Sequence, residues 1–129
     1  MTTPTSIPPI DGCEVVQANG YLRATVAGTR AHDVQECYRA IAEECLRRHC
    51  ERVLILGNSM SDAFAHLAGR DVLRSMALAG VSARFRLALI AQTPDLIAIY
   101  DTAVVEARRL GIDARRFRNE KDAVKWLSE

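Results

Sequence analysis

Val53-Leu54-Ile55-Leu56 is a continuous apolar run that ends at Gly57, and a second apolar run extends from Phe85 to Ala91. Strands covered on both faces have this composition, because neither face of the strand meets water. Two such runs therefore predict two central strands of a parallel sheet.

Segments with the period of a helix follow these strands or precede them. The first has apolar residues at steps of three and four: Val34, Cys37, Tyr38, Ile41 and Cys45. It predicts a helix from about Asp33 to His49, with Asp33 and Glu36 as a capping pair. A second helical stretch is expected from Ser61 to Gly80.

Two more helices are expected in the last third of the chain. One begins at Thr93-Pro94 and ends at Gly111, with a buried stripe made of Leu96, Tyr100, Ala103, Ala107 and Leu110. The other is a short terminal helix capped by Asn119, and its apolar face includes Trp126. A lone tryptophan is seldom left in water, so we expect this indole to dock on the sheet.

The remaining strands are expected near the two ends of the chain. Asn19-Gly20 stands between the β-prone runs 13–18 and 21–27, and predicts a hairpin with a type I′ turn. Residues 112–117 alternate polar and apolar, which indicates an edge strand. The fold class is therefore a single α/β domain over residues 12–129, after a loose tail at 1–11. It has a mainly parallel sheet of about five strands, an N-terminal antiparallel hairpin and about four helices.

Composition limits the class of function. Of 129 residues, 49% are apolar and 26% charged, and 17 basic side chains against 16 acidic ones leave a net charge of +1. That balance argues against a nucleic-acid partner. No apolar stretch approaches the roughly 20 residues of a membrane span, and the start of the chain lacks a secretory signal. We therefore expect a cytoplasmic location, no stable membrane insertion, and free thiols at Cys13, Cys37, Cys45 and Cys50.

Three stretches resemble the SpoIIAA-like branch of the STAS (sulphate transporter and anti-sigma-factor antagonist) family. They are TVAGTRAHDV at 25–34, FRLALIA at 85–91 with the later RRLGIDARRF, and the ending from Phe117 to Leu127. The resemblance covers about residues 13–128. It implies strands mostly in sequence order and a protein that acts by binding, without catalytic residues. In that family a phosphorylated serine follows the third strand. Here the loop reads Gly57-Asn58-Ser59-Met60-Ser61-Asp62, without the aspartate and glycine of the family's motif.

Ligands of open α/β sheets bind beyond the carboxyl ends of the parallel strands. Two sets of candidates lie there. The possible interaction or phospho-acceptor loop contains Asn58, Ser59, Ser61 and Asp62, and the possible anion or ligand rim contains Thr29, Arg30, Gln92, Thr93, Arg118 and Asn119. Helix N-termini would favour a phosphate or carboxylate at this edge. Simple capping by Ser61, Thr93 and Asn119 is the competing interpretation.

Three other groupings suggest chemistry. Cys45, His49 and Cys50 are close in sequence but lack the spacing of a zinc site, so no metal or cofactor is expected. Ser59 or Ser61 with His66 would suggest a hydrolase, with Asp33 or Asp62 as the orienting carboxylate, but the GxSxG elbow is missing. The arginines of 108–118 form either a solvated rim or a surface for an acidic protein or anionic lipid.

The function predicted from these features is a non-catalytic regulatory or protein-interaction module with an unidentified protein partner. The alternative is a protein that binds a small apolar or anionic, lipid-like ligand. A homodimer is also expected, because Arg23, Thr25, Arg86 and Ala88 would lie on a sheet face that needs cover.

Overall fold

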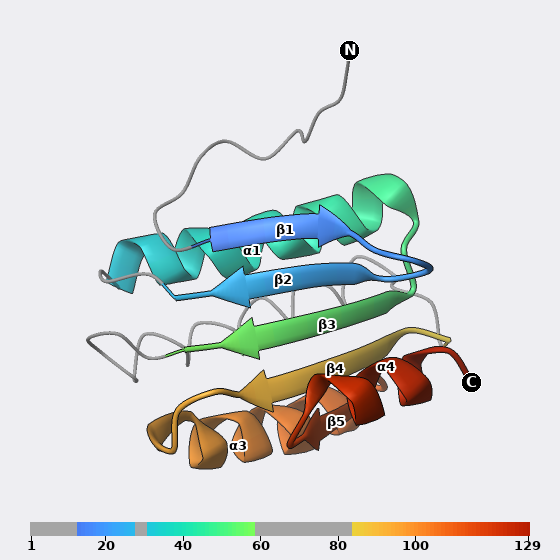
Figure 1. The fold of residues 1–129 in the computed structure, drawn as a ribbon. Helices are drawn as coiled ribbons and strands as arrows, with labels where there is room; N and C mark the ends of the chain where they lie inside the picture. Colours follow the sequence, from blue (N-terminus) through green and yellow to red (C-terminus); the bar gives the residue numbers. More distant parts are fainter. Residues whose placement is uncertain (1–12, 28–30, 59–83) are drawn as a thin grey trace.

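The computed structural model describes residues 13–27, 31–58 and 84–129, which form a five-stranded mixed sheet with helices on both faces (Figure 1). The strands are β1 (Cys13–Gln17), β2 (Leu22–Val26), β3 (Arg52–Gly57), β4 (Arg86–Ala91) and β5 (Asp113–Phe117). They lie side by side in chain order, with β1 antiparallel to β2 and the rest parallel. The predicted α/β class, hairpin and edge position of β5 are confirmed.

The hairpin differs from the expected one in its turn. Ala18 N–H donates to the Tyr21 carbonyl at 2.8 Å, so the turn residues are Asn19 and Gly20, as predicted. Gly20 has a φ of +85°, but Asn19 is not left-handed. A type I′ turn needs a positive φ at both residues, so that part of the prediction is wrong.

The described residues contain three helices: α1 (Ala31–Arg48), α3 (Asp95–Arg109) and α4 (Glu120–Leu127). The fourth expected helix, at 61–80, lies outside the described residues. Asp33 falls inside the first turn of α1, so it is not the residue that precedes the helix and the expected capping pair is wrong. Gly111 ends α3 as expected, with a φ of +87° that glycine adopts without strain.

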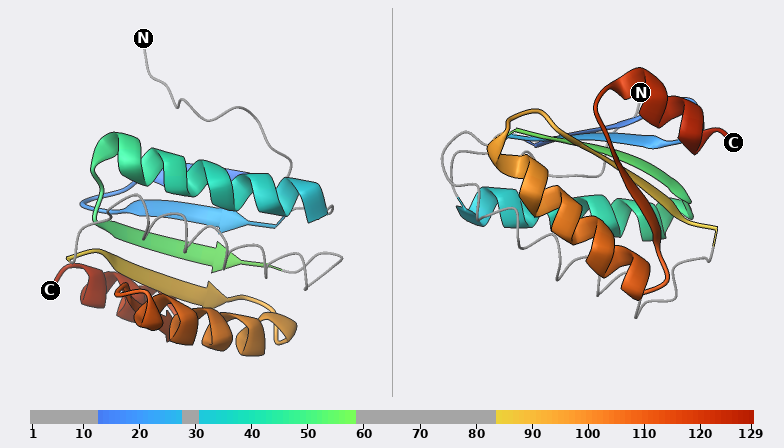
Figure 2. Two further views of the ribbon diagram at one scale, coloured as in Figure 1. Left: turned by 180° about the vertical axis from the view of Figure 1, so that it is seen from behind. Right: turned by 90° about the horizontal axis from the view of Figure 1, so that it is seen from below.

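Helices α1 and α3 lie on one face of the sheet and α4 lies on the other (Figure 2). Right-handed connections between parallel neighbours in chain order all cross the same face. Helix α4 follows the last strand and returns over the opposite face. We call these the α1–α3 face and the α4 face.

Strand β3 shows why an unbroken apolar run was needed. Val53 and Ile55 belong to the core beneath α1 and α3, whereas Leu54 and Leu56 belong to the core beneath α4. All four are buried. The prediction of a strand covered on both faces is confirmed, as is the buried stripe of α1 formed by Val34, Cys37, Tyr38, Ile41 and Cys45.

Trp126 docks α4 on the sheet, as predicted. It is only 5% exposed and packs with Leu54, Leu56 and Ile90 in one core. The guanidinium groups of Arg86 and Arg115 each lie 5.2 Å from the centre of its ring.

Helix α4 also covers part of the sheet face for which a homodimer was expected. Ala88 is fully buried in the core beneath it, and Arg23 forms an ion pair with Glu120 at 2.7 Å. The chain therefore covers Ala88 itself and engages Arg23 and Arg86 through α4, so the argument for a homodimer loses three of its four residues. In the part of the chain that the structure describes, no helix is both long and apolar enough to cross a membrane.

Candidate functional site

The carboxyl edge of the parallel sheet brings part of the predicted site together. In register, Val26 pairs with Gly57, Gly57 with Ala91, and Ile90 with Phe117. The residues that follow β3, β4 and β5 therefore leave the sheet at the same edge. Those residues include Asn58, Gln92, Thr93, Arg118 and Asn119 of the predicted set, whereas Thr29, Arg30, Ser59, Ser61 and Asp62 lie outside the described residues.

Main-chain hydrogen bonds fix the start of two of these loops. Asn58 N–H donates to the Val26 carbonyl and Gln92 N–H to the Gly57 carbonyl, both at 2.8 Å. Each bond extends the parallel ladder by one residue beyond the strand. The backbone at Asn58 and Gln92 is thus held in place, while the Gln92 side chain is exposed and Asn58 is half-buried.

Asn119 is a helix cap. Its side-chain oxygen accepts from Asp122 N–H at 2.8 Å, and its amide group donates to the Asp122 carboxylate at 3.2 Å. Both ends of the Asn119 amide are therefore engaged locally, which supports the capping interpretation for this residue. Helix α3 is entered through Thr93 and Pro94, as predicted: Pro94 already has helical angles (φ −59°, ψ −30°), which suit a proline in the first turn of a helix.

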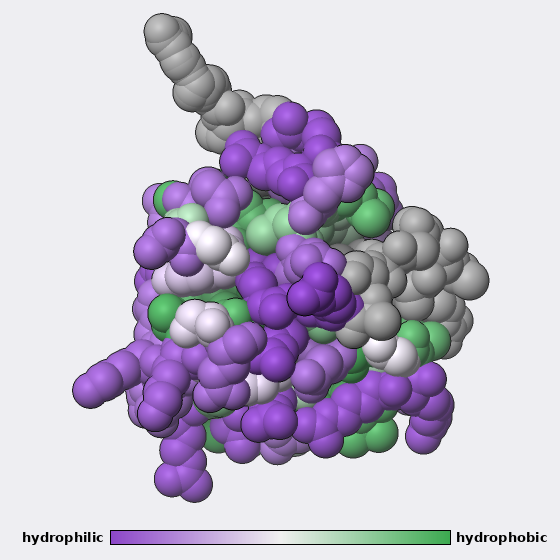
Figure 3. Space-filling model, turned by 90° about the vertical axis from the view of Figure 1, so that its right-hand side faces the viewer, coloured by the Kyte–Doolittle hydropathy of each residue, from purple (hydrophilic) through white to green (hydrophobic). Residues whose placement is uncertain are grey.

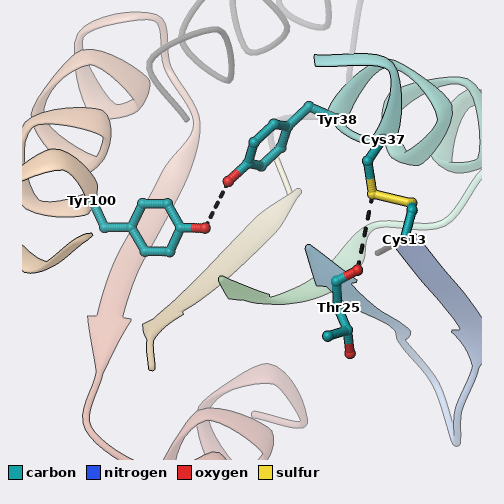
Figure 4. Close-up of a disulfide and its surroundings, with 5 residues drawn as sticks. All are labelled: Cys13, Thr25, Cys37, Tyr38 and Tyr100. Atoms are coloured by element: carbon teal, nitrogen blue, oxygen red, sulfur yellow. Dashed lines mark hydrogen bonds between the residues drawn. A yellow bond between two sulfur atoms is a disulfide. The ribbon is translucent and has the colours of Figure 1, made fainter. Parts of the chain in front are cut away.

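Two buried tyrosines, which the sequence analysis assigned only to helix stripes, meet above the end of β3. The Tyr38 hydroxyl from α1 lies 2.6 Å from the Tyr100 hydroxyl from α3 (Figure 4). A Cβ placed on Gly57 would lie 1.8 Å from the Tyr100 hydroxyl oxygen. Glycine at this position therefore makes room for the tyrosine pair. The signal in the sequence was a polar tip within each stripe and a glycine directly after the apolar run.

Burial raises the pKa of both phenols. The pKa of Tyr38 is raised well above its ordinary value by desolvation, with the neighbouring Tyr100 adding to the rise. Desolvation also raises the pKa of Tyr100, against an opposing effect of its hydrogen bond to Tyr38. Both hydroxyls are protonated in the neutral range, so the pair holds α1 to α3 by a neutral hydrogen bond.

The cysteines contradict the expectation of four free thiols. Cys13 of β1 and Cys37 of α1 form a disulfide, with their Cα atoms 5.6 Å apart (Figure 4). Sequence spacing could not reveal this pair, because 24 residues and a hairpin separate the partners. They meet because Cys13 pairs with Val26 at the end of β2 and α1 packs over that end.

Cys45 and Cys50 stay free and are brought close by the end of α1. His49 adopts a φ of +53°, and Cys50 N–H returns to donate to the Cys45 carbonyl at 2.9 Å. Desolvation raises the pKa of Cys45 to about 12, and the Cys50 thiol lies 3.1 Å from the Arg52 carbonyl. Within residues 13–27, 31–58 and 84–129, no group of three or more metal-ligating side chains comes together.

Most of the predicted arginine rim is occupied by contacts within the chain. Arg116 binds Asp101 at 2.6 Å, Arg109 binds Glu106 at 3.5 Å, and Arg108 donates to the Ala114 carbonyl. Arg115 lies over Trp126, and Arg118 is exposed at the carboxyl edge. Four of the five arginines are therefore engaged by other groups of the same chain.

The hydrolase grouping cannot be assembled from the described residues. Ser59, Ser61, Asp62 and His66 lie outside them. Asp33, the other proposed carboxylate, is buried in the first turn of α1.

The opposite, amino edge of the sheet has an open polar pocket of about 460 Å³. Hydrophilic side chains dominate this side of the molecule (Figure 3). The pocket is lined by Gln17, Gly20, Arg48, His49, Cys50, Glu51, Arg52, Leu127, Ser128 and Glu129. Its arginines are engaged: Arg48 binds Glu44 at 2.8 Å, and Arg52 donates to the Leu127 carbonyl at 2.9 Å.

No protein-family model matches this chain, and neither does any curated protein or solved structure.

Proposed function

We propose that this chain is a non-catalytic protein-interaction module of STAS-like type, whose partner binds at the carboxyl edge of the sheet. The observation that carries the proposal is the shared edge at which the segments after β3, β4 and β5 leave the sheet, with Asn58 and Gln92 fixed by main-chain bonds. Polar residues whose backbone is already held by the sheet suit recognition of a protein surface, because Asn58 and Gln92 need little ordering on binding.

The packing beneath that edge supports a surface partner over an internal ligand. Tyr38 and Tyr100 are both buried, and the Tyr100 ring lies directly against Gly57. An apolar ligand between helices and sheet at this point would have to displace the tyrosine pair. The loop that begins at Asn58, after β3, contains Ser59 and Ser61. We propose this loop as the place where a phosphate would regulate binding.

The proposal is tested by comparing two edges of one sheet. An affinity capture with the intact chain identifies a partner, and its Kd is then measured for Gln92→Ala with Arg118→Glu and for the amino-edge control Arg48→Glu. We expect the carboxyl-edge variant to bind at least tenfold more weakly, about 1.4 kcal/mol, and the control to bind like the parent. Equal binding by the parent and both variants would contradict the proposal.

Phosphate regulation has its own test. Ser59→Glu and Ser61→Glu should keep the fold and change the Kd of the same partner tenfold or more. Ser→Ala at either position should leave the Kd unchanged if the hydroxyls only cap a helix, and would then cost about 0.5–2 kcal/mol of stability. Parent-like binding by both glutamate variants removes the phosphate from the proposal and leaves the interaction surface in place.

The second candidate is binding of a small anionic ligand, favoured by the polar pocket at the amino edge. Native mass spectrometry of the purified chain tests it directly. A bound molecule that Arg52→Ala no longer retains would support a ligand-binding function, and a bare mass would support the interaction module.

The proposal includes a cytoplasmic setting and a homodimer as the chain's own assembly. Val16, 46% exposed on edge strand β1, lies on the part of the α4 face beyond Arg23 and is the residue that supports self-association. Light scattering at micromolar concentration should give twice the monomer mass for the parent and the monomer mass for Val16→Lys. A monomeric parent would contradict the dimer.

A further inference from the structure

We infer that the Cys13–Cys37 disulfide is a reversible redox link, attacked by thiols at the Cys13 sulfur, and that its reduction releases β1 from α1. This inference is independent of the proposed partner. It rests on where the two cysteines lie and on how β1 is otherwise held.

The two sulfurs differ in their surroundings. Cys37 is 1% exposed and belongs to the core of the α1–α3 face, whereas Cys13 is half-buried at the first position of the edge strand. An attacking thiolate needs direct approach to a sulfur. The approach to Cys37 is blocked by the core, so Cys13 is the sulfur attacked.

The exchange balances with a dithiol as reductant. One thiolate of the dithiol bonds to Cys13 Sγ, and the Cys13–Cys37 bond breaks with Cys37 leaving as a thiolate that takes up a proton. The second thiolate of the dithiol then attacks the dithiol's other sulfur, the one bonded to Cys13 Sγ in the mixed disulfide. That closes the disulfide of the reductant and releases Cys13, which is protonated in turn. Two electrons pass from the dithiol to the protein.

The reduced state has a place for the buried thiol. Cys37 Sγ lies 3.9 Å from the Thr25 carbonyl oxygen (Figure 4). A disulfide sulfur carries no proton, so this contact becomes a weak S–H···O hydrogen bond when Cys37 is reduced. The core residue therefore keeps a polar partner after the link opens.

Strand β1 depends on the link more than any other strand does. It pairs with β2 alone, and its side chains Glu14, Val16 and Gln17 are exposed. Only Cys13 and Val15 pack against the core, and both do so partly. Reduction removes the covalent attachment of β1 to α1. The short edge strand is then held by its ladder with β2, by the packing of Val15 and by one exposed hydrogen bond, which Arg48 donates to Gln17 Oε1 at 3.4 Å.

The test compares the full chain after oxidation with glutathione disulfide and after reduction with dithiothreitol. Alkylation in denaturant, read by intact mass, should add two labels to the oxidised chain and four to the reduced chain. Hydrogen exchange at residues 13–17 should be at least tenfold faster in the reduced chain, with β4 and β5 unchanged. The Tm should fall by roughly 10 °C, because a closed loop of this length constrains the unfolded chain.

Two variants and one monothiol reagent show which sulfur is attacked and whether the effects come from this disulfide. Cys13→Ser should take up three labels in both conditions and show the fast β1 exchange and low Tm of the reduced chain. The matched control Cys50→Ser should take up one label after oxidation and three after reduction, with the same changes in exchange and Tm as the parent. Limited glutathione should form a mixed disulfide that maps to Cys13. Four labels after oxidation, a mixed disulfide on Cys37, or equal hydrogen exchange at β1 in both states of the parent would each overturn the inference, whether or not Cys13→Ser folds.

Discussion

The two faces of the sheet are closed in different ways. The α1–α3 face is covered by helices of 18 and 15 residues, whose aliphatic stripes meet β2, β3 and β4 in one large core. The α4 face is covered by a helix of eight residues, which has only Ala123, Trp126 and Leu127 fully buried. A short helix buries little apolar area, so polar contacts must help to set its position.

Those polar contacts surround α4 at both ends. Glu120 in its first turn is bound by Arg23 of β2, and the carbonyls of its last turn accept from arginines of β3 and β4. Cations at a helix C-terminus also interact favourably with its dipole. The α1–α3 face is therefore stabilised mainly by its large buried apolar area. The α4 face depends mainly on the Trp126 side chain and the charged groups around it.

The largest expected effect comes from removing that aromatic side chain. Trp126→Ala should lower the free energy of unfolding by about 3–5 kcal/mol, because it empties the centre of the smaller core and leaves Arg86 and Arg115 without the ring. Denaturant unfolding measures the change. The exposed neighbour Lys125→Ala is the control and should change stability little, and a Trp126→Ala variant as stable as that control would refute this account of α4.

The next effect tests the close packing of the other face. Gly57→Ala should cost about 1–3 kcal/mol, because its Cβ would overlap the Tyr100 hydroxyl group. Tyr100→Phe in the Gly57→Ala background removes the nearest atom and should recover part of the loss, although ring carbons 2.6 and 2.9 Å from that Cβ remain. Strictly additive losses in the double variant would show that the two residues do not conflict.

A smaller effect is expected from the hydrogen bond between α1 and α3. Tyr38→Phe should cost about 1–2 kcal/mol near neutral pH, since one partner of a buried bond is removed. The cost can be measured by urea unfolding. The control is Tyr21→Phe, which removes the same hydroxyl group from a half-buried tyrosine on the opposite face and should change stability little. No loss of stability would mean that this bond contributes nothing net.

The same tyrosines predict alkaline behaviour. With a pKa raised above the unfolded value of about 10, each phenol stays protonated in the folded chain while the unfolded chain loses its proton. The contribution of these two phenols to the free energy of unfolding is therefore fully present below about pH 10. Above that pH the free energy of unfolding falls by about 1.4 kcal/mol per pH unit for each phenol. Cys45, raised from 9 to about 12, should add a loss that begins near pH 9. Tyr38→Phe should make the decline less steep, and an unchanged slope would contradict the assignment.

The smallest effect concerns the ion pair at the start of α4. Glu120→Gln should cost less than about 1 kcal/mol, because its side chain and that of Arg23 are 38% and 34% exposed. The hydrogen bond from Arg23 lowers the pKa of Glu120, so this contribution is present above the unfolded pKa of 4.5 and is lost as the pH falls below it. The difference in stability between parent and variant, followed from pH 7 to pH 3, should shrink to zero.

Periodicity predicted the described elements well because burial alone decides them. The apolar run of β3 and the stripe of α1 need no knowledge of their neighbours, and both are where the pattern placed them. The misses depend on contacts between distant residues. The disulfide joins residues across a hairpin, and the contact of Gly57 with Tyr100 joins a strand end to a later helix. Of the candidate site, the sequence predicted that the residues after β3, β4 and β5 share an edge and that Asn119 caps the last helix, but it did not predict that Tyr38 and Tyr100 meet beneath that edge.

The order of the strands has a consequence for synthesis of the chain. Because each strand lies beside its predecessor, contact order is low for a sheet protein, and the sheet can grow from one side as residues emerge from the ribosome. Helix α4 breaks this local rule, since it returns to cover β3 and β4. Until α4 emerges, Leu54, Leu56, Ala88 and Ile90 present an apolar stripe, so the nascent chain is prone to aggregate in the interval between the synthesis of β4 and that of α4.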